Sequence, residues 1–229
     1  MQKFIIIAID GPAASGKSTL AKKLADQLHY LYVDTGAMYR AITFYALENN
    51  FIDNHKALIE SLNNLELELE YSNGLTRVFL NNKEITDKIR TPEVNANVSD
   101  ISKIPEVRKK MVSLQQKMAS NRNLVVEGRD TTTVVFPDAD VKIFLTADIK
   151  ERAKRRYLEY KEKGEKVTLE SVEKSILNRD KIDSNRKISP LKKAEDAVQL
   201  DTTDLTVKEE IESLINILKK RNNLAIKNK

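Results

Sequence analysis

The fold is decided by the stretch Gly11-Pro12-Ala13-Ala14-Ser15-Gly16-Lys17-Ser18-Thr19. An apolar, β-branched run at residues 4–9 precedes it, and a segment with helical periodicity follows it. The stretch matches G-x-x-x-x-G-K-[ST], a loop whose backbone N–H groups surround a polyphosphate. The helix that follows directs its positive dipole end at the anion. We therefore expect all nine residues to form a nucleotide-binding phosphate loop between a strand and a helix.

Two side chains of this loop have a predicted chemical role. Lys17 supplies a positive charge for the β- and γ-phosphates, and the Ser18 hydroxyl suits Mg²⁺, which prefers oxygen ligands. ATP with Mg²⁺ is therefore the expected cofactor, with most of the metal's contacts made by nucleotide and water.

Composition limits the class of protein. A chain of 229 residues buries roughly 70% of its unfolded surface, which predicts one α/β domain with a small insertion. Cysteine is absent, which excludes disulfides, thiolate catalysis and Cys-ligated metals. The first apolar run is too short for a signal peptide or a membrane span, so we expect a cytoplasmic protein without a membrane partner.

The charge balance favours anionic ligands. Lys and Arg total 39 against 34 Asp and Glu, a net charge of +5. Many cations fall at residues 150–156 and 179–187, where a solvated helix face is the simpler interpretation.

Strands and helices alternate along most of the chain. Short β-rich runs at 4–9, 30–33, 124–126, 141–145 and 197–200 are separated by helical patterns. This order predicts a five-stranded parallel sheet flanked by helices in three layers, with the phosphate loop at the carboxyl edge. We assign 1–59 and 96–220 to this core, and 150–168 within it to a short helical lid.

One region breaks the alternation. Residues 65–71 alternate strictly between apolar and polar, 72–74 have turn chemistry, and 76–80 are β-rich. This predicts an antiparallel hairpin within an insertion at about 60–95. Residues 221–229 are expected to form a disordered basic tail.

The remaining motifs narrow the class of phosphate-loop protein. The chain has neither the N-K-x-D nor the D-x-x-G pattern of GTPases, and it is too short for a nucleic-acid motor. A small kinase must instead hold two anions in line, with positive groups converging from distant segments. The candidate cations are Arg152, Arg155 and Arg156 on one helix, and Arg179 and Arg186, with Asp183 between them, on another. A solvent-facing stripe of charged residues on each helix explains either set equally.

Four motifs in this order resemble the bacterial cytidylate kinase family over nearly the whole chain, to about residue 220. They are the phosphate loop, Asp34-Thr35-Gly36-Ala37-Met38-Tyr39-Arg40, Glu127-Gly128-Arg129-Asp130 followed by Thr133-Val134-Val135-Phe136-Pro137, and Arg179-Asp180 through Asp183 and Arg186. The resemblance implies a nucleoside monophosphate kinase fold with a monophosphate-binding insertion, and transfer of the γ-phosphoryl group of ATP to CMP or dCMP. It also implies a monomer.

The resemblance assigns roles to individual residues. It implies CMP-phosphate contacts from Thr35, Arg40, Arg129 and Arg186, cytosine contacts from Ser99, Arg108 and Asp130, and positions near the ribose for Arg179 and Asp183. The catalytic cations are then Lys17, Arg129 and Arg186 with the lid arginines Arg152 and Arg155.

One departure from the family pattern concerns the base site. Thr131 and Thr132 stand where the family has an apolar residue and then glycine, a change expected to affect the tight turn that aims Asp130. Two other functions stay open: a kinase for a different small acceptor, such as another nucleotide or shikimate, and an ATP-binding regulator or RNA-binding module. The basic clusters lack the interleaved aromatic residues of RNA-binding proteins, so no nucleic-acid partner is expected.

Overall fold

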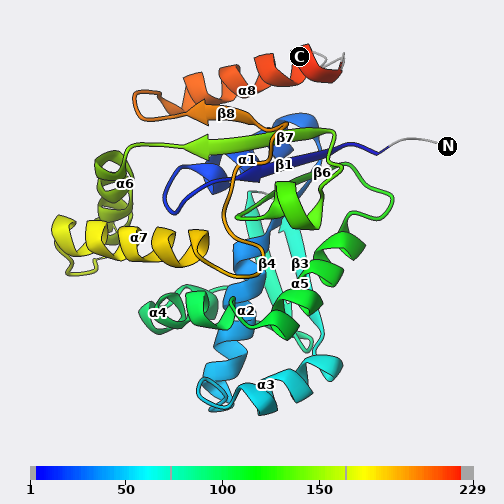
Figure 1. Cartoon of the computed structure of the whole chain (residues 1–229), viewed down its shortest axis with the longest axis vertical. Helices are drawn as coiled ribbons and strands as arrows, with labels where there is room; N and C mark the ends of the chain where they lie inside the picture. The colour runs from blue at the N-terminus through cyan, green and yellow to red at the C-terminus, as the bar shows by residue number, and fades with distance from the viewer. Residues whose placement is uncertain (1–3, 73, 163, 223–229) are drawn as a thin grey trace.

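The computed structural model describes residues 4–72, 74–162 and 164–222, and its main feature is a five-stranded parallel sheet (Figure 1). The strand order is β2-β6-β1-β7-β8, and every neighbouring pair is parallel. The bounds are β1 Ile6–Asp10, β2 Leu31–Asp34, β6 Leu124–Gly128, β7 Val141–Thr146 and β8 Val198–Asp201. The predicted α/β fold class is confirmed.

Helices cover both faces of the sheet because its inner strands are apolar on both sides. Ile7 and Ile9 of β1 pack in one cluster with α1 (Lys17–Leu28) and α8 (Val207–Asn222). Ala8 between them packs in a second cluster with α2 (Thr35–Glu48), α3 (His55–Ser61) and α5 (Pro105–Met118). The alternation of strand side chains thus produces the three layers.

The predicted hairpin is present in a second, antiparallel sheet. It consists of β3 (Leu67–Ser72), β4 (Leu75–Leu80) and β5 (Lys83–Glu84), while Asn73 of the expected turn lies outside the described residues. Leu67, Val78 and Leu80 pack in the same cluster as α2. A short 3₁₀ helix, Leu62–Asn64, precedes this sheet, and another, Lys88–Arg90, follows it.

A helix that the sequence pattern did not predict, α4 (Pro92–Ile101), follows the second sheet. Pro92 occupies its first turn, where proline is tolerated, and the Thr91 hydroxyl caps it by accepting a hydrogen bond from Val94 N at 3.3 Å. This side of the molecule therefore presents α4 to the edge of the main sheet where β1, β2 and β6 end.

Two helices form an arm beside the sheet, α6 (Ile149–Glu162) and α7 (Leu169–Ser184) (Figure 1). Gly164 lies between them with a φ of 75°, a left-handed conformation that glycine adopts without strain. The arm packs against the phosphate loop through Ala13, Ala153 and Ile176.

The last helix, α8, runs to Asn222, so residues 221 and 222 of the expected disordered tail are helical. The rest of the predicted tail, 223–229, lies outside the described residues. Among the helices of the described chain, none is long and apolar enough to span a bilayer.

Candidate active site

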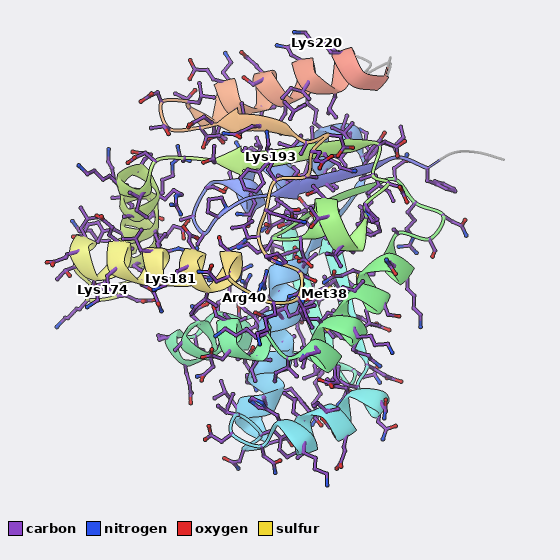
Figure 2. The ribbon with its side chains drawn as sticks, viewed as in Figure 1. Met38, Arg40, Lys174, Lys181, Lys193 and Lys220 are labelled. Carbon is purple, nitrogen blue, oxygen red and sulfur yellow. The ribbon has the colours of Figure 1, made fainter. Side chains whose placement is uncertain are left out.

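The carboxyl edge of the sheet opens into a cavity of about 730 Å³ between the phosphate loop, α2, α4, α6 and α7. In Figure 2, Arg40 of α2 lies near the centre of the molecule beside the end of α7, whereas Lys174 and Lys181 lie along α7 itself. Most predicted site residues line this cavity: Ala13, Ala14, Ser15, Gly16, Lys17, Ser18, Thr19, Thr35, Arg40, Ser99, Arg129, Asp130, Arg155, Arg179, Asp183 and Arg186. Gly11, Pro12, Arg108 and Arg152 are not among its lining residues.

The phosphate loop has the backbone that its glycines predict. Gly16 precedes α1 with a φ of 90°, a conformation that disfavours a side chain. A Cβ atom at Gly11 would lie 2.0 Å from the Leu145 carbonyl oxygen of β7. The geometry of the loop therefore favours glycine at both positions.

Lys17 is turned into its own loop. Its Nζ donates to the Pro12 carbonyl oxygen at 2.5 Å and to Ser15 Oγ at 3.1 Å. Burial, followed by the nearby positive charge of Arg129, lowers the pKa of Lys17 to about 7. A bound phosphate would therefore compete with Pro12 and Ser15 for the Lys17 amine.

Ser18 contacts a carboxylate whose role was not predicted from the sequence, that of Glu127. The Ser18 hydroxyl donates to Glu127 Oε1 at 2.7 Å, and the Tyr32 hydroxyl donates to the same atom at 3.3 Å. Burial, and then the negative charge of Asp34, raise the pKa of Glu127. An acidic residue at the end of a buried strand on the phosphate edge was the available signal.

Oxygen atoms from Ser18 and Glu127 fit Mg²⁺, which is commonly held by a loop hydroxyl, one carboxylate, water and nucleotide phosphates. A larger cage of three or more metal-binding side chains is not found among the described residues.

Asp34 caps the N-terminus of α2 and pairs with two arginines. Its Oδ1 caps the helix by accepting from Ala37 N at 2.8 Å, and the helix begins at Thr35. Its Oδ2 accepts from Arg40 at 3.3 Å and from Arg90 at 3.2 Å. The Thr35 hydroxyl donates to the Glu127 carbonyl oxygen at 2.8 Å.

Asp183 is the centre of a second cluster of arginines. Its carboxylate lies 2.9 Å from Arg129 Nε, 3.7 Å from Arg186 Nη1 and 4.0 Å from Arg179 Nε. Burial acts to raise the pKa of Asp183, but the three cations outweigh it and lower the pKa below its ordinary value. Burial, and then Arg129, lower the pKa of Arg179 to about 10. The cluster therefore has more positive charge than one carboxylate balances.

Several buried nitrogen atoms in these arginines have no hydrogen-bond partner in the described residues. They are Arg40 Nε, Arg179 Nε, Arg186 Nε and Arg186 Nη2. Unused donors on a surplus of positive charge are what an incoming phosphate requires.

Of the predicted base-reading residues, Arg108 and Asp130 pair with each other, and Asp130 and Ser99 line the cavity. Arg108 forms a buried ion pair with Asp130, donates to the Ser102 carbonyl oxygen at 3.1 Å, and lies 5.2 Å from the Tyr39 ring centre. Burial acts to lower the pKa of Arg108, but Tyr39 and Asp130 outweigh it, so the pKa is raised. Ser99 of α4 is also buried and lines the cavity.

The glycine missing after Asp130 is not required by the backbone. Thr131 and Thr132 open a π-helical turn, Thr131–Val135, and neither has a positive φ. Both hydroxyls bind Asp10. The turn forms without glycine.

The lid arginines differ in their partners. Arg152 donates to the carbonyl oxygens of Ala147 at 3.0 Å and Ala13 at 3.1 Å, and also binds Asp180. Asp180 in turn accepts from Ala13 N at 3.0 Å. Arg152 is therefore occupied in holding the phosphate loop against α6 and α7.

Arg155 is similarly occupied. It donates to Glu151 at 3.1 Å and to the Thr202 carbonyl oxygen at 2.6 Å, and lies 3.6 Å from Glu210 of α8. Arg156, which lines the cavity, has an ion pair only with its exposed neighbour Glu159 at 3.0 Å in the described chain. Helical spacing alone could not predict which of these three arginines is bound to carbonyl oxygens of the protein.

Comparisons with known proteins agree with this geometry. Residues 7–220 match the family model described as cytidylate kinase. The chain is 50% identical to a cytidylate kinase of Oceanobacillus iheyensis, with 97% of each chain covered. It is 49% identical to one of Bacillus cytotoxicus, with 95% of this chain and 97% of that one covered.

A crystal structure of an uncharacterized protein from Eubacterium ventriosum has a similar fold, with a TM-score of 0.51, 16% identity, and coverage of 96% of this chain and 100% of the other. The sequence matches extend over the phosphate loop and both arginine clusters, so this chain belongs to the cytidylate kinase family.

Proposed function

We propose that this protein transfers the γ-phosphoryl group of ATP to CMP or dCMP, giving ADP and CDP or dCDP. The observation that carries the proposal is that a phosphate loop and a surplus of buried arginine donors line the same cavity. No covalent intermediate is needed, because phosphoryl transfer depends mainly on alignment and on stabilisation of charge.

The donor phosphates bind the loop from Gly11 to Thr19. Lys17 leaves the Pro12 carbonyl oxygen and contacts the β- and γ-phosphates, which restores its positive charge. Ser18 and Glu127 are the residues that would hold Mg²⁺, together with water and the nucleotide, and the ion would supply positive charge to the phosphates.

The acceptor phosphate binds between the two arginine clusters. Arg40, Arg129 and Arg186 direct their unused or weakly paired donors to it, together with the Thr35 hydroxyl. Asp183 balances the charge of the neighbouring guanidinium groups before the ligand arrives, and with Arg179 it lies near the ribose.

Cytosine is recognised by a carboxylate and a guanidinium that are already paired. Asp130 accepts from the N4 amino group, Arg108 donates to N3 or O2, and Ser99 completes the contact. Uracil presents an oxygen in place of N4 and meets Asp130 oxygen to oxygen, which disfavours UMP.

Among the lid cations, Arg156 is the one placed to contact the transferring phosphoryl group. It lines the same cavity as Arg40 and Arg179, and its ion-pair partner in the described chain is the exposed Glu159. Arg152 and Arg155 hold the phosphate loop and the start of α8, and contribute to catalysis through these positions.

Domain roles and assembly follow the same scheme. Residues 150–168 act as the lid and 60–95 as the monophosphate-binding insertion of a cytoplasmic monomer. Of residues 60–95, Arg90 and Asn95 line the described cavity, and further residues of α4 line it next to them.

The test is release of ADP from ATP and Mg²⁺ with each nucleoside monophosphate in turn, and with shikimate. CMP and dCMP should give the highest kcat/KM. A higher value with any other acceptor would overturn the assignment, and so would tight, salt-sensitive binding of RNA without phosphoryl transfer.

A further inference from the structure

Asp10 is a fully buried carboxylate that the proposed reaction does not use. It ends β1, directly before Gly11 of the phosphate loop. Its Oδ1 accepts from Thr131 N at 2.9 Å and from Thr131 Oγ1 at 2.7 Å. Its Oδ2 accepts from Thr132 N at 2.7 Å and from Thr132 Oγ1 at 2.6 Å. Four hydrogen bonds therefore hold this carboxylate to two consecutive residues.

The two threonines directly follow Arg129 and Asp130. The Asp130 carbonyl oxygen accepts from Val134 N at 2.9 Å in the turn that they open. Before them, Gly128 pairs in register with Asp10, and a Cβ atom there would lie 2.7 Å from the Thr131 methyl group. The backbone of Asp130 is thus fixed from both sides.

This arrangement connects the two ends of the active site. Asp10 is the last residue of β1, directly before the phosphate loop. Its carboxylate also anchors the turn that carries the base reader Asp130. A shift of the turn would move Asp130 relative to Arg108, which comes from a different helix.

We propose that Asp10, Thr131 and Thr132 are positioning residues that set cytosine selectivity by fixing the turn which aims Asp130. The proposal rests on the proposed function, since it concerns discrimination between CMP and UMP. The hydroxyl groups of Thr131 and Thr132 add two hydrogen bonds to Asp10 that an apolar residue and a glycine at these positions could not make.

The threonines are the residues to change. The Asp10 charge also acts on the pKa of Lys17, opposing the dominant lowering by burial, so a substitution of Asp10 would alter the donor end as well. Thr131→Val and Thr132→Val keep the side-chain shape and the backbone hydrogen bonds but remove one hydroxyl donor each. The matched control is Thr133→Val in the same turn, because the buried Thr133 hydroxyl has no hydrogen-bond partner in the described chain.

The experiment measures kcat/KM for CMP and for UMP, KM for ATP, and CMP affinity by calorimetry. The double variant Thr131→Val/Thr132→Val should lose about tenfold in the CMP to UMP ratio and in CMP affinity, with KM for ATP within about twofold of the parent. Thr133→Val should keep the parental ratio, and Thr131→Ser/Thr132→Ser should restore it.

A double variant that unfolds at a lower temperature but keeps the parental ratio and CMP affinity would show a structural role only and overturn the proposal. If the double variant does not fold, each single variant is measured by the same criteria. A parent protein that does not prefer CMP would instead refute the proposed function, which keeps the two failures distinct.

Discussion

The donor and acceptor ends of the cavity solve the same problem, binding phosphate, in different ways. The donor end is one continuous segment whose backbone does most of the work, and its single cation is turned inward onto Pro12. The acceptor end collects arginines from α2, α7 and the turn after β6, and it balances them with Asp34 and Asp183. A backbone site needs no counterion before its ligand binds, whereas a cluster of buried guanidinium groups does.

The largest effect should come from the donor end. Lys17→Ala removes the charge that stabilises the transferring phosphoryl group, so kcat should fall on the order of 10³-fold. The measurement is coupled ADP release with saturating CMP and ATP. Lys22→Ala on the same helix is the control and should change kcat little, because Lys22 does not line the cavity.

Circular dichroism should show that Lys17→Ala keeps its secondary structure. Turnover at the parental rate by this folded variant would mean that the phosphate loop does not bind the reacting phosphates, and the contrast between the two ends would disappear.

The next effect tests the counterion at the acceptor end. Asp183→Asn leaves Arg129, Arg179 and Arg186 without their shared carboxylate, and should cost about 2 kcal/mol in the free energy of unfolding at neutral pH. The pKa of Asp183 is lowered in the folded protein, so its stabilisation is present above the unfolded pKa near 4 and is lost as pH falls through the folded value.

Urea unfolding of the parent and of Asp183→Asn at pH 7, and at decreasing acidic pH, measures this. The difference between the two proteins should shrink as pH falls. Asp204→Asn at an exposed position serves as control, and an Asp183→Asn variant as stable as the parent at pH 7 would mean that the cluster does not depend on this carboxylate.

A smaller effect is expected at the base reader. Asp130→Ala removes the acceptor for the cytosine amino group and should reduce the ratio of kcat/KM for CMP over UMP by about tenfold or more. KM for ATP should change little, since the ion-pair partner of Asp130 is Arg108 of α5 and not a residue of the phosphate loop. An unchanged ratio would remove Asp130 from base recognition.

The same contrast explains how far the sequence could be interpreted. The loop from Gly11 to Thr19 was predicted from its pattern because it is local, and its chemistry depends on backbone geometry. The five-stranded parallel sheet and the hairpin followed from alternation and periodicity, whereas the order of the strands in the sheet was not predicted. The expected roles of Ser99 and Arg108 came only from resemblance, because residues far apart in the sequence meet through tertiary packing, as Arg108 and Asp130 do across 22 positions.

The sequence did not predict the roles of residues that depend on their contacts with other parts of the fold. Glu127 belongs to a sequence motif, but only its contact with Ser18 in the structure indicates its role. The arginines at 152, 155 and 156 have equivalent helical spacing, yet two of them are occupied by carbonyl oxygens of Ala13 and Thr202. Helix α4 was not predicted, although Pro92 in its first turn stands where proline is compatible with a helix.

The smallest predicted effect concerns protons at the donor end. Free Lys17, with a pKa of about 7, is largely neutral at about pH 8, and a bound polyphosphate requires it charged. Binding of ADP with Mg²⁺ should therefore take up close to one proton per site at that pH, and affinity should weaken by at most tenfold per unit as pH rises. Calorimetry in two buffers of different ionisation enthalpy measures the uptake, and Lys17→Met should abolish it. Equal uptake by parent and Lys17→Met would place the titrating group elsewhere. In contrast, CMP binding to arginines that stay charged at this pH should take up little, which makes proton uptake a direct measure of the difference between the two ends.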